Sequence, residues 1–322
     1  MFKVILRRLI ILIPQLIFIS MMIFLLSELM PGDAFAHLIE DPDVSEETIM
    51  ALREAAGLND PLPVRYGRWL HGVVTRFDFG VSLSHRRDAI EIIGERATNT
   101  AILGTLTLAL TYIISIPLGI IAGRKSGKWS DKTILLYSFI TLAIPTIVMS
   151  IVVLFVFGFT LGWIPIRGSV SVMEVSGTFG YFTSRIHHLL GPALTGAVLG
   201  GTFVVFFLRN EIVDTQNSDY VTTARAKGVP ERVVYNKHIL RNSILPIVPG
   251  IGGALAAILT GSIFIEQMFS FPGMGGLFLT AIGQRDFPII LAISTIFSVL
   301  IALGVLLGDI LLVVVDPRIR IK

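Results

Sequence analysis

Six apolar stretches, each near 20 residues or longer, restrict the fold of this chain more than any other feature. A helix of about 20 residues crosses the roughly 30 Å hydrocarbon core of a bilayer. Of the 322 residues, 53% are hydrophobic and only 15% are charged, which excludes an ordinary soluble domain. The sequence therefore predicts an all-α integral membrane protein with six transmembrane helices, at residues 9–29, 101–123, 134–159, 189–208, 247–265 and 288–315.

Pro14, Pro117 and Pro145 lie inside three of these stretches. Neighbouring helices satisfy the carbonyl groups that proline leaves free in a membrane, so we expect kinks rather than breaks. The first stretch has an alternative interpretation as a cleaved signal peptide, with the small residues of Ala34-Phe35-Ala36 at cleavage spacing. Its apolar run exceeds the about 7–15 residues of a secretory core, which favours an uncleaved anchor.

Lysine and arginine residues are distributed unequally between the two sides of the predicted bundle. Both termini and the loops after the second and fourth stretches together carry sixteen of them, whereas the two short loops on the other side carry only Arg167, Arg185 and Arg285. Short cytoplasmic loops carry the excess of basic residues, so both termini are predicted to be cytoplasmic. The basic residues are explained by the membrane surface, and no nucleic-acid partner is expected.

Residues 30–98 form the long segment between the first two spans and are predicted to lie outside the cell. Ser45 is a plausible helix start, and the segment is expected to contain short helices broken by Pro42, Gly57, Pro61 and Pro63. A solvated linker is one interpretation. A packed extracellular cap is favoured because the segment holds many large apolar side chains, at Tyr66, Trp69, Leu70, Phe77 and Phe79.

A second notable segment, residues 209–246, is predicted to be cytoplasmic. Ser218 or Asp219 can cap a short helix that Gly228, followed by Pro230, then stops. Small residues such as Ala224 and Gly228 would let the backbone of a partner approach closely, although a generic loop is the alternative. The chain thus divides into residues 1–29, a cap at 30–98, and a membrane core at 99–322 that includes the 209–246 loop.

One long motif of the cytoplasmic segment reads Tyr220-Val-Thr-Thr-Ala-Arg-Ala-Lys-Gly228 and is followed by Arg241-Asn-Ser-Ile-Leu-Pro246. Three further motifs are Pro31-Gly32-Asp33, Glu266-Gln-Met-Phe-Ser-Phe-Pro-Gly-Met-Gly275 and Asp316-Pro317-Arg318. With these motifs in this order, the chain resembles the permeases of binding-protein-dependent ATP-binding-cassette (ABC) importers, within the oligopeptide, dipeptide and nickel group. Thr222 and Thr223 stand where the wider family begins its motif with glutamate and alanine, a departure that the peptide-like group shares.

The resemblance implies the type I importer permease fold in a bacterial cell membrane. It implies a second homologous permease, two ATPase subunits that hold ATP and magnesium at the cytoplasmic face, and an extracellular substrate-binding protein. The ATPase-coupling residues that it implies are Asp219, Tyr220, Thr223, Ala224, Arg225, Ala226, Lys227 and Gly228. The implied cargo is an oligopeptide or dipeptide, with nickel or glutathione as alternatives.

No catalytic site, cofactor or metal site is expected in the chain itself. The sequence contains no phosphate-binding G-x-x-x-x-G-K-[ST] loop, and its adjacent histidines would point in different directions. An autonomous ion-coupled transporter is the remaining alternative. Glu266 and Asp309 are candidate pathway or interface residues: Glu266 could face the pathway or cap the next turn, and Asp309 is expected to pair with a neighbouring span or the membrane interface. Gly196-x-x-x-Gly200 and Gly304-x-x-x-Gly308 are weak signals of close helix packing.

Overall fold

A computed structural model describes residues 2–29, 60–171 and 173–315, together with residues 45, 47, 48, 50 and 54. The Pro31-Gly32-Asp33 and Asp316-Pro317-Arg318 motifs, the Ala34-Phe35-Ala36 tripeptide, Pro42 and Gly57 lie outside the described residues. The described part is helical, and its only β pairing is an isolated bridge between Val81 and Asp88. At Ser45 the side-chain hydroxyl accepts a hydrogen bond from the Thr48 N–H at 3.2 Å, the bond expected of a helix start.

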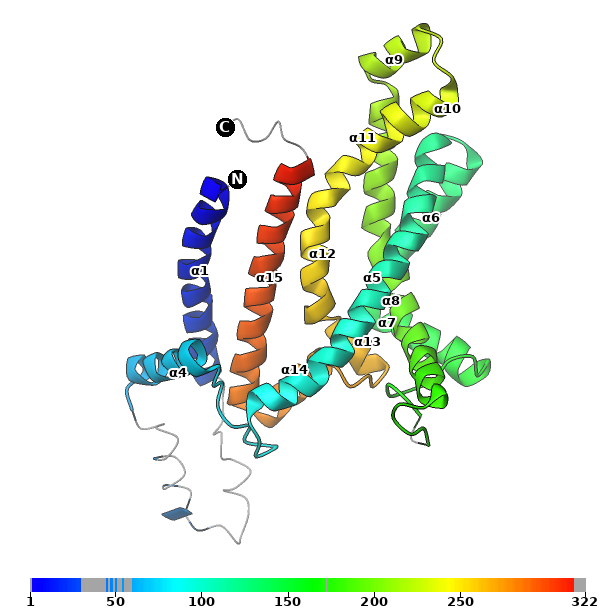
Figure 1. Cartoon of the computed structure of the whole chain (residues 1–322). Helices are drawn as coiled ribbons and strands as arrows, with labels where there is room; N and C mark the ends of the chain where they lie inside the picture. Colours follow the sequence, from blue (N-terminus) through cyan, green and yellow to red (C-terminus); the bar gives the residue numbers. More distant parts are fainter. Residues whose placement is uncertain are drawn as a thin grey trace.

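The long helices run side by side between two ends of the molecule (Figure 1). They are α1 (Phe2–Glu28), α5 (Ala89–Arg124), α6 (Trp129–Ala143), α8 (Phe179–Gln216), α12 (Val248–Thr260) and α15 (Phe287–Val315). Shorter elements join them: α4 (Leu62–Arg76), α7 (Thr146–Val153), η1 (Leu154–Thr160), α9 (Asp219–Ala226), α10 (Glu231–Val233), η2 (Val234–Leu240), α11 (Arg241–Ile244), η3 (Leu245–Ile247), α13 (Ile263–Met268) and α14 (Met274–Gln284).

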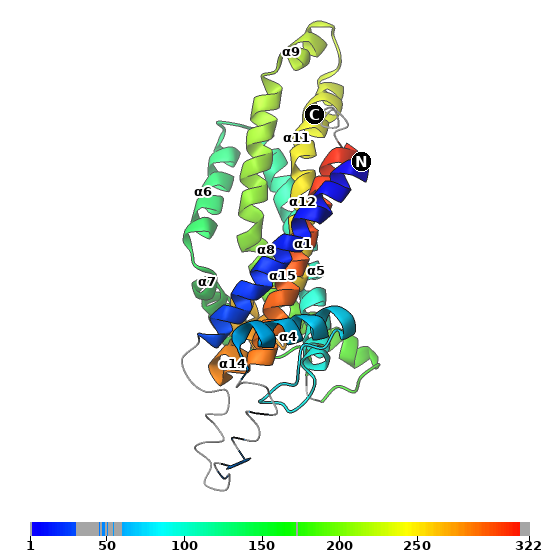
Figure 2. The ribbon, with the colours of Figure 1, turned by 90° about the vertical axis from the view of Figure 1, so that its left-hand side faces the viewer.

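Five helical segments of the described residues are long and apolar enough to cross a membrane, and a sixth is formed if the pair around Pro145 counts as one span. Helix α9 lies at one end of the bundle, toward which α1 begins and α15 ends, and α4 lies across the other end (Figures 1 and 2). The predicted all-α membrane fold with six spans is therefore confirmed, with the third span bent.

The prediction of a mere kink at Pro145 was wrong. Helix α6 ends at Ala143, and the following pair of helices turns by 104° from it. Ile144 takes an extended conformation with ψ of 120°, because the ring of a following proline disfavours the helical conformation. Pro14 and Pro117, by contrast, lie inside continuous helices. Neither Pro61 nor Pro63 breaks a helix, since α4 begins there and proline is favoured in a first helical turn.

Glycines bring the helices of the core into close contact. A Cβ atom added at Gly123 of α5 would lie 2.7 Å from the Cβ of Ile212 of α8, and one added at Gly196 of α8 would lie 2.8 Å from Thr107 Cγ2 of α5. Similarly, a Cβ at Gly304 of α15 would lie 2.8 Å from the Gly252 carbonyl oxygen of α12. Both predicted small-residue motifs thus contact helices of this same chain.

Candidate coupling surface and transmembrane cavity

Helix α9 ends in a tight cap built around Gly228. The Gly228 N–H donates to the Arg225 carbonyl at 2.9 Å, and the Val229 N–H donates to the Ala224 carbonyl at 3.3 Å. These two bonds form a Schellman motif, in which the residue after the helix takes a left-handed conformation. Gly228 has φ of +73°, which only glycine adopts without a steric cost. At the other end the predicted side-chain cap is absent, because the Ser218 hydroxyl donates to the Thr215 carbonyl instead.

The inner face of α9 is fixed to its own chain. Val221 is fully buried and Ala224 nearly so, in a cluster with Leu208 and Ile212 of α8 and with the helix η2. Ala224 therefore packs inside this chain, and the expectation that it lets a partner approach was wrong for this residue. Only two turns of helix are present, so the i, i+3 spacing of Val221 and Ala224 determines which face is buried.

The outer face of α9 is open. The exposed residues are Asp219, Tyr220, Thr222, Thr223, Arg225, Ala226, Lys227 and Gly228. Tyr220, at 46% exposure, is a large side chain at this surface, and its hydroxyl accepts a hydrogen bond from the Asn242 amide at 3.2 Å. A Cβ added at Gly228 would meet no atom within 4 Å. The surface thus has room for another protein chain.

Arg225 and Glu231 make a two-bond ion pair beside this surface, with nitrogen to oxygen distances of 3.1 and 2.8 Å. The hydrogen bond to Arg225 lowers the pKa of Glu231, and the same bond raises the pKa of Arg225. Both side chains are exposed, so the pair contributes little stability. It joins the helix to the segment that follows Pro230.

A second ion pair, which sequence reasoning missed, ties α8 to α6 at the same end of the bundle. Arg209 donates to both carboxylate oxygens of Asp131 at 2.9 Å, and the Gly127 N–H donates to Asp131 at 2.8 Å. Asp131 is almost completely buried. The two residues stand at the ends of neighbouring predicted spans on the side of the basic loops, and that juxtaposition of opposite charges is the signal that could have found them.

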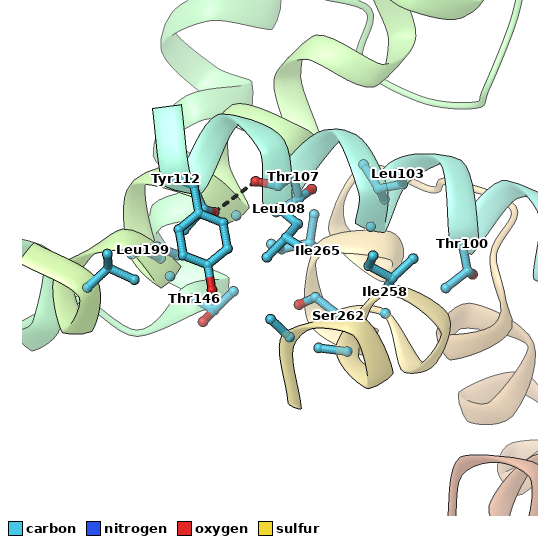
Figure 3. A pocket seen from close by; sticks show the side chains of 18 residues that line it. Thr100, Leu103, Thr107, Leu108, Tyr112, Thr146, Leu199, Ile258, Ser262 and Ile265 are labelled. Atoms are coloured by element: carbon cyan, nitrogen blue, oxygen red, sulfur yellow. Dashed lines mark hydrogen bonds between the residues drawn. The ribbon is translucent and has the colours of Figure 1, made fainter. Parts of the chain in front are cut away.

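A cavity of about 410 Å³ opens between α5, α8 and α12 within the membrane-spanning part (Figure 3). Six of its lining residues carry hydroxyl groups, and no charged side chain is among the described residues that line it. The hydroxyl-bearing residues are Thr100, Thr107, Thr111, Tyr112, Thr146 and Ser262. Sequence reasoning missed this site, although threonines seven and four residues apart on one helix share a face.

Glu266 lies fully buried behind this cavity. Its carboxylate accepts the Thr100 hydroxyl at 2.8 Å and the N–H groups of Gly275 and Gly276 at 2.7 and 3.2 Å. These N–H groups belong to the first turn of α14, where a negative charge is stabilised. Of the two alternatives for Glu266, the geometry shows the cap of the next turn, and Glu266 is not among the residues that line the cavity.

Asp309 of α15 pairs with Arg8 of α1 at 3.2 Å. A groove of about 230 Å³ between these two helices includes both residues. Such a pair fits the expected contact with a neighbouring span. The structure thus separates the two candidate acids: Glu266 fastens α13 and α14 to α5, whereas Asp309 fastens α1 to α15.

Comparison with known proteins covers the whole chain. Residues 1–115 match the N-terminal model of binding-protein-dependent transport system membrane components, and residues 115–321 match the model of the inner membrane component. An oligopeptide transport system permease protein of Bacillus subtilis (AppB) is 37% identical over 317 residues, 98% of each chain. A putative peptide permease of Brucella ovis and a glutathione transport system permease of Salmonella paratyphi A are each 32% identical over all of both chains.

These matches confirm the resemblance drawn from the motifs between Tyr220 and Gly275. They also agree with the helical spans, since the matched family consists of membrane components. Its description names a transport system that depends on a separate binding protein. The chain belongs to the family of binding-protein-dependent transport system inner membrane components, as a multi-pass permease of the ABC importer type.

Proposed function

We propose that this permease imports oligopeptides or dipeptides that an extracellular binding protein delivers. In this proposal it pairs with a second homologous permease, and two ATPase subunits dock at the end of the bundle that carries α9. Both termini and α9 then face the cytoplasm of a bacterial cell. The proposal is supported by the basic loops at that end and by the names of relatives, which include oligopeptide and peptide permeases beside the glutathione permeases.

The observation that carries the proposal is the rigid connection between α9 and α8. Helix α8 runs without a break from Phe179 to Gln216, and α9 packs onto its last turns through Val221 and Ala224. A push on the exposed face of α9 would therefore move α8, whose other part lines the cavity. This is the linkage that an ATPase needs in order to shift a permease between two global states.

The cavity supports a peptide cargo by its chemistry. Hydroxyl groups both donate and accept hydrogen bonds, as peptide groups require, and the described residues of the lining carry no charge that would select acidic or basic side chains. A site for glutathione, which carries net negative charge, would be expected to offer a cationic group. We therefore assign the cavity to one half of the wall of a peptide pathway, with selectivity residing mainly in the binding protein.

Uptake of a labelled tripeptide by cells that lack the native permease and express Gly228 variants tests the proposal. Gly228→Leu is expected to abolish uptake while the protein still inserts in the membrane. Gly228→Asn is the matched control, because asparagine tolerates positive φ and yet adds bulk at the surface. Loss of uptake in both variants would indicate contact with a partner, whereas loss in Gly228→Leu alone would indicate backbone strain at the cap.

The same cells distinguish the alternatives for cargo and energy source. Glutathione or nickel accumulation without peptide uptake would overturn the peptide assignment. Uptake that persists after ATP is depleted, with the ion gradient maintained, would favour an autonomous ion-coupled transporter. Normal peptide uptake by Gly228→Leu would contradict the proposed role of α9.

A further inference from the structure

A basic cavity lies at the end of the bundle opposite α9, and the proposed transport function does not use it. It has a volume of about 330 Å³ and lies between α4 and α1. Arg65, Arg68 and Arg76, all from α4, line it, and among the described residues Asp78 is the only acidic one that does so. One Asp78 carboxylate oxygen already accepts the Gly80 N–H at 2.9 Å. Arginine side chains thus outnumber acidic ones in the described lining, which suits an anion.

Contacts between α4 and α1 fix the depth of this cavity. The Tyr66 hydroxyl donates to the Ile17 carbonyl at 3.1 Å and lies 2.8 Å from the Ser20 hydroxyl. The apolar window of α1 runs from Ile10 to Ser27, and Phe24, the α1 residue that lines the cavity, lies roughly 5 Å from its end at 1.5 Å per residue. Helix α4 lies across the end of α1 that points away from α9 (Figure 2). The cavity therefore lies close to the depth at which hydrocarbon meets phospholipid headgroups.

The surface of α4 has the composition of a helix that rests in a membrane interface. Exposed apolar side chains at Val64 and Val74 accompany the arginines. Tyr66 packs edge-on against Phe24 of α1 and Trp69 packs at a tilt against it, with ring centroids 5.6 and 6.0 Å from the Phe24 ring. Aromatic rings gather at the headgroup level of membranes, and arginines extend their charged ends toward phosphates there.

Two donors at the cavity lack acceptors among the residues that the structure describes. The Trp69 indole nitrogen is buried and unpaired, although a buried tryptophan N–H ordinarily has a partner. Arg76 makes no ion pair or hydrogen bond within the described ranges, whereas Arg68 pairs with Asp60 at 2.7 Å on the exposed side. An incoming group with acceptor oxygens and negative charge would satisfy the Arg76 guanidinium, which is exposed at the cavity.

We propose that this cavity binds the phosphate of an anionic phospholipid headgroup. The guanidinium groups of Arg68 and Arg76 bind its oxygens, since arginine matches phosphate with paired hydrogen bonds. The acyl chains lie along the exposed apolar residues of α1 and α4. A lipid, rather than a soluble phosphate, is the source because the cavity lies beside the apolar surface of a spanning helix.

Native mass spectrometry of the full chain, purified in detergent in its isolated assembly and titrated with phosphatidylglycerol, tests this proposal. Arg68→Gln/Arg76→Gln is expected to bind the lipid about tenfold more weakly, which corresponds to 1.4 kcal/mol. Arg86→Gln/Arg167→Gln removes the same charge from exposed sites at the same end and is expected to bind as the unaltered chain does. Thermal unfolding of both variants without added lipid checks that each is folded.

Two further ligands distinguish binding of a lipid headgroup from binding of a soluble phosphate compound. Diacylglycerol with the same acyl chains is expected to show no dependence on Arg68 and Arg76, and millimolar glycerol 3-phosphate is expected not to displace phosphatidylglycerol. Equal lipid binding by the two double variants would overturn the site. Displacement by glycerol 3-phosphate would overturn the assignment to a lipid.

Discussion

Helix α15 packs against its two neighbours in different ways, through backbone atoms on one face and through side chains on another. On one face it meets α12 through glycines, so closely that a Cβ atom at Gly252 would contact backbone atoms of Gly304 and Gly308. On another face it meets α1 through side chains, with a groove of about 230 Å³ and the Arg8–Asp309 pair between them. Backbone contact leaves no side chain free to adjust, whereas side-chain contact does. The comparison indicates that α12 and α15 move as one body, to which α1 is attached more loosely.

The largest effect is expected where two backbones touch. Gly252→Ala should lower the free energy of unfolding by roughly 1–3 kcal/mol or more, because neither helix can retreat without losing contacts elsewhere. Its neighbour Gly253 supplies the matched control, since a Cβ atom there meets nothing within 4 Å. Gly253→Ala should change stability by less than about 1 kcal/mol, and in the stabilising direction. Thermal unfolding in detergent compares the two, and equal effects would refute the backbone contact.

A smaller effect is expected at the ion pair on the other face. Arg8→Leu should cost about 2 kcal/mol, less than the 3–5 kcal/mol of a fully buried pair, because Arg8 is about half exposed. Arg8→Leu/Asp309→Leu should recover most of that loss, since it removes the uncompensated carboxylate as well. A double-mutant cycle by thermal unfolding measures the coupling, and additive effects would mean that the pair does not hold α1 on α15.

The smallest effect is expected at the hydrogen bonds that join Tyr66 of α4 to α1. Tyr66→Phe removes the hydrogen bonds to the Ile17 carbonyl and the Ser20 hydroxyl, and should cost about 1 kcal/mol. Ser20→Ala should cost less, because Tyr66 keeps its bond to Ile17. Stability measured for the two single variants and the double variant provides the check. A double variant that is much less stable than Tyr66→Phe would show that Ser20 acts through another contact.

Sequence reasoning found the spans and missed most of what connects them. Apolar length alone predicted the spanning segments, since the bilayer sets it. The break at Pro145 was missed because a proline in a membrane helix can give either a kink or a break, and packing decides between them. Ala224 was placed outward because an eight-residue helix gives little periodicity, and the choice for Glu266 required knowing that Thr100, 166 residues away in sequence, approaches it.

The central claim, that the exposed face of α9 meets a cytoplasmic ATPase, is tested most directly by cross-linking. The chain contains no cysteine, so Thr223→Cys introduces a single thiol on that face, and Thr75→Cys on α4 introduces one at the opposite end. With benzophenone maleimide coupled to the thiol in membranes that contain the assembled transporter and then irradiated, Thr223→Cys should become linked to an ATPase subunit and Thr75→Cys should not. A Thr223→Cys thiol that forms no such link, and that reacts in intact cells with an impermeant maleimide added from outside, would contradict the account.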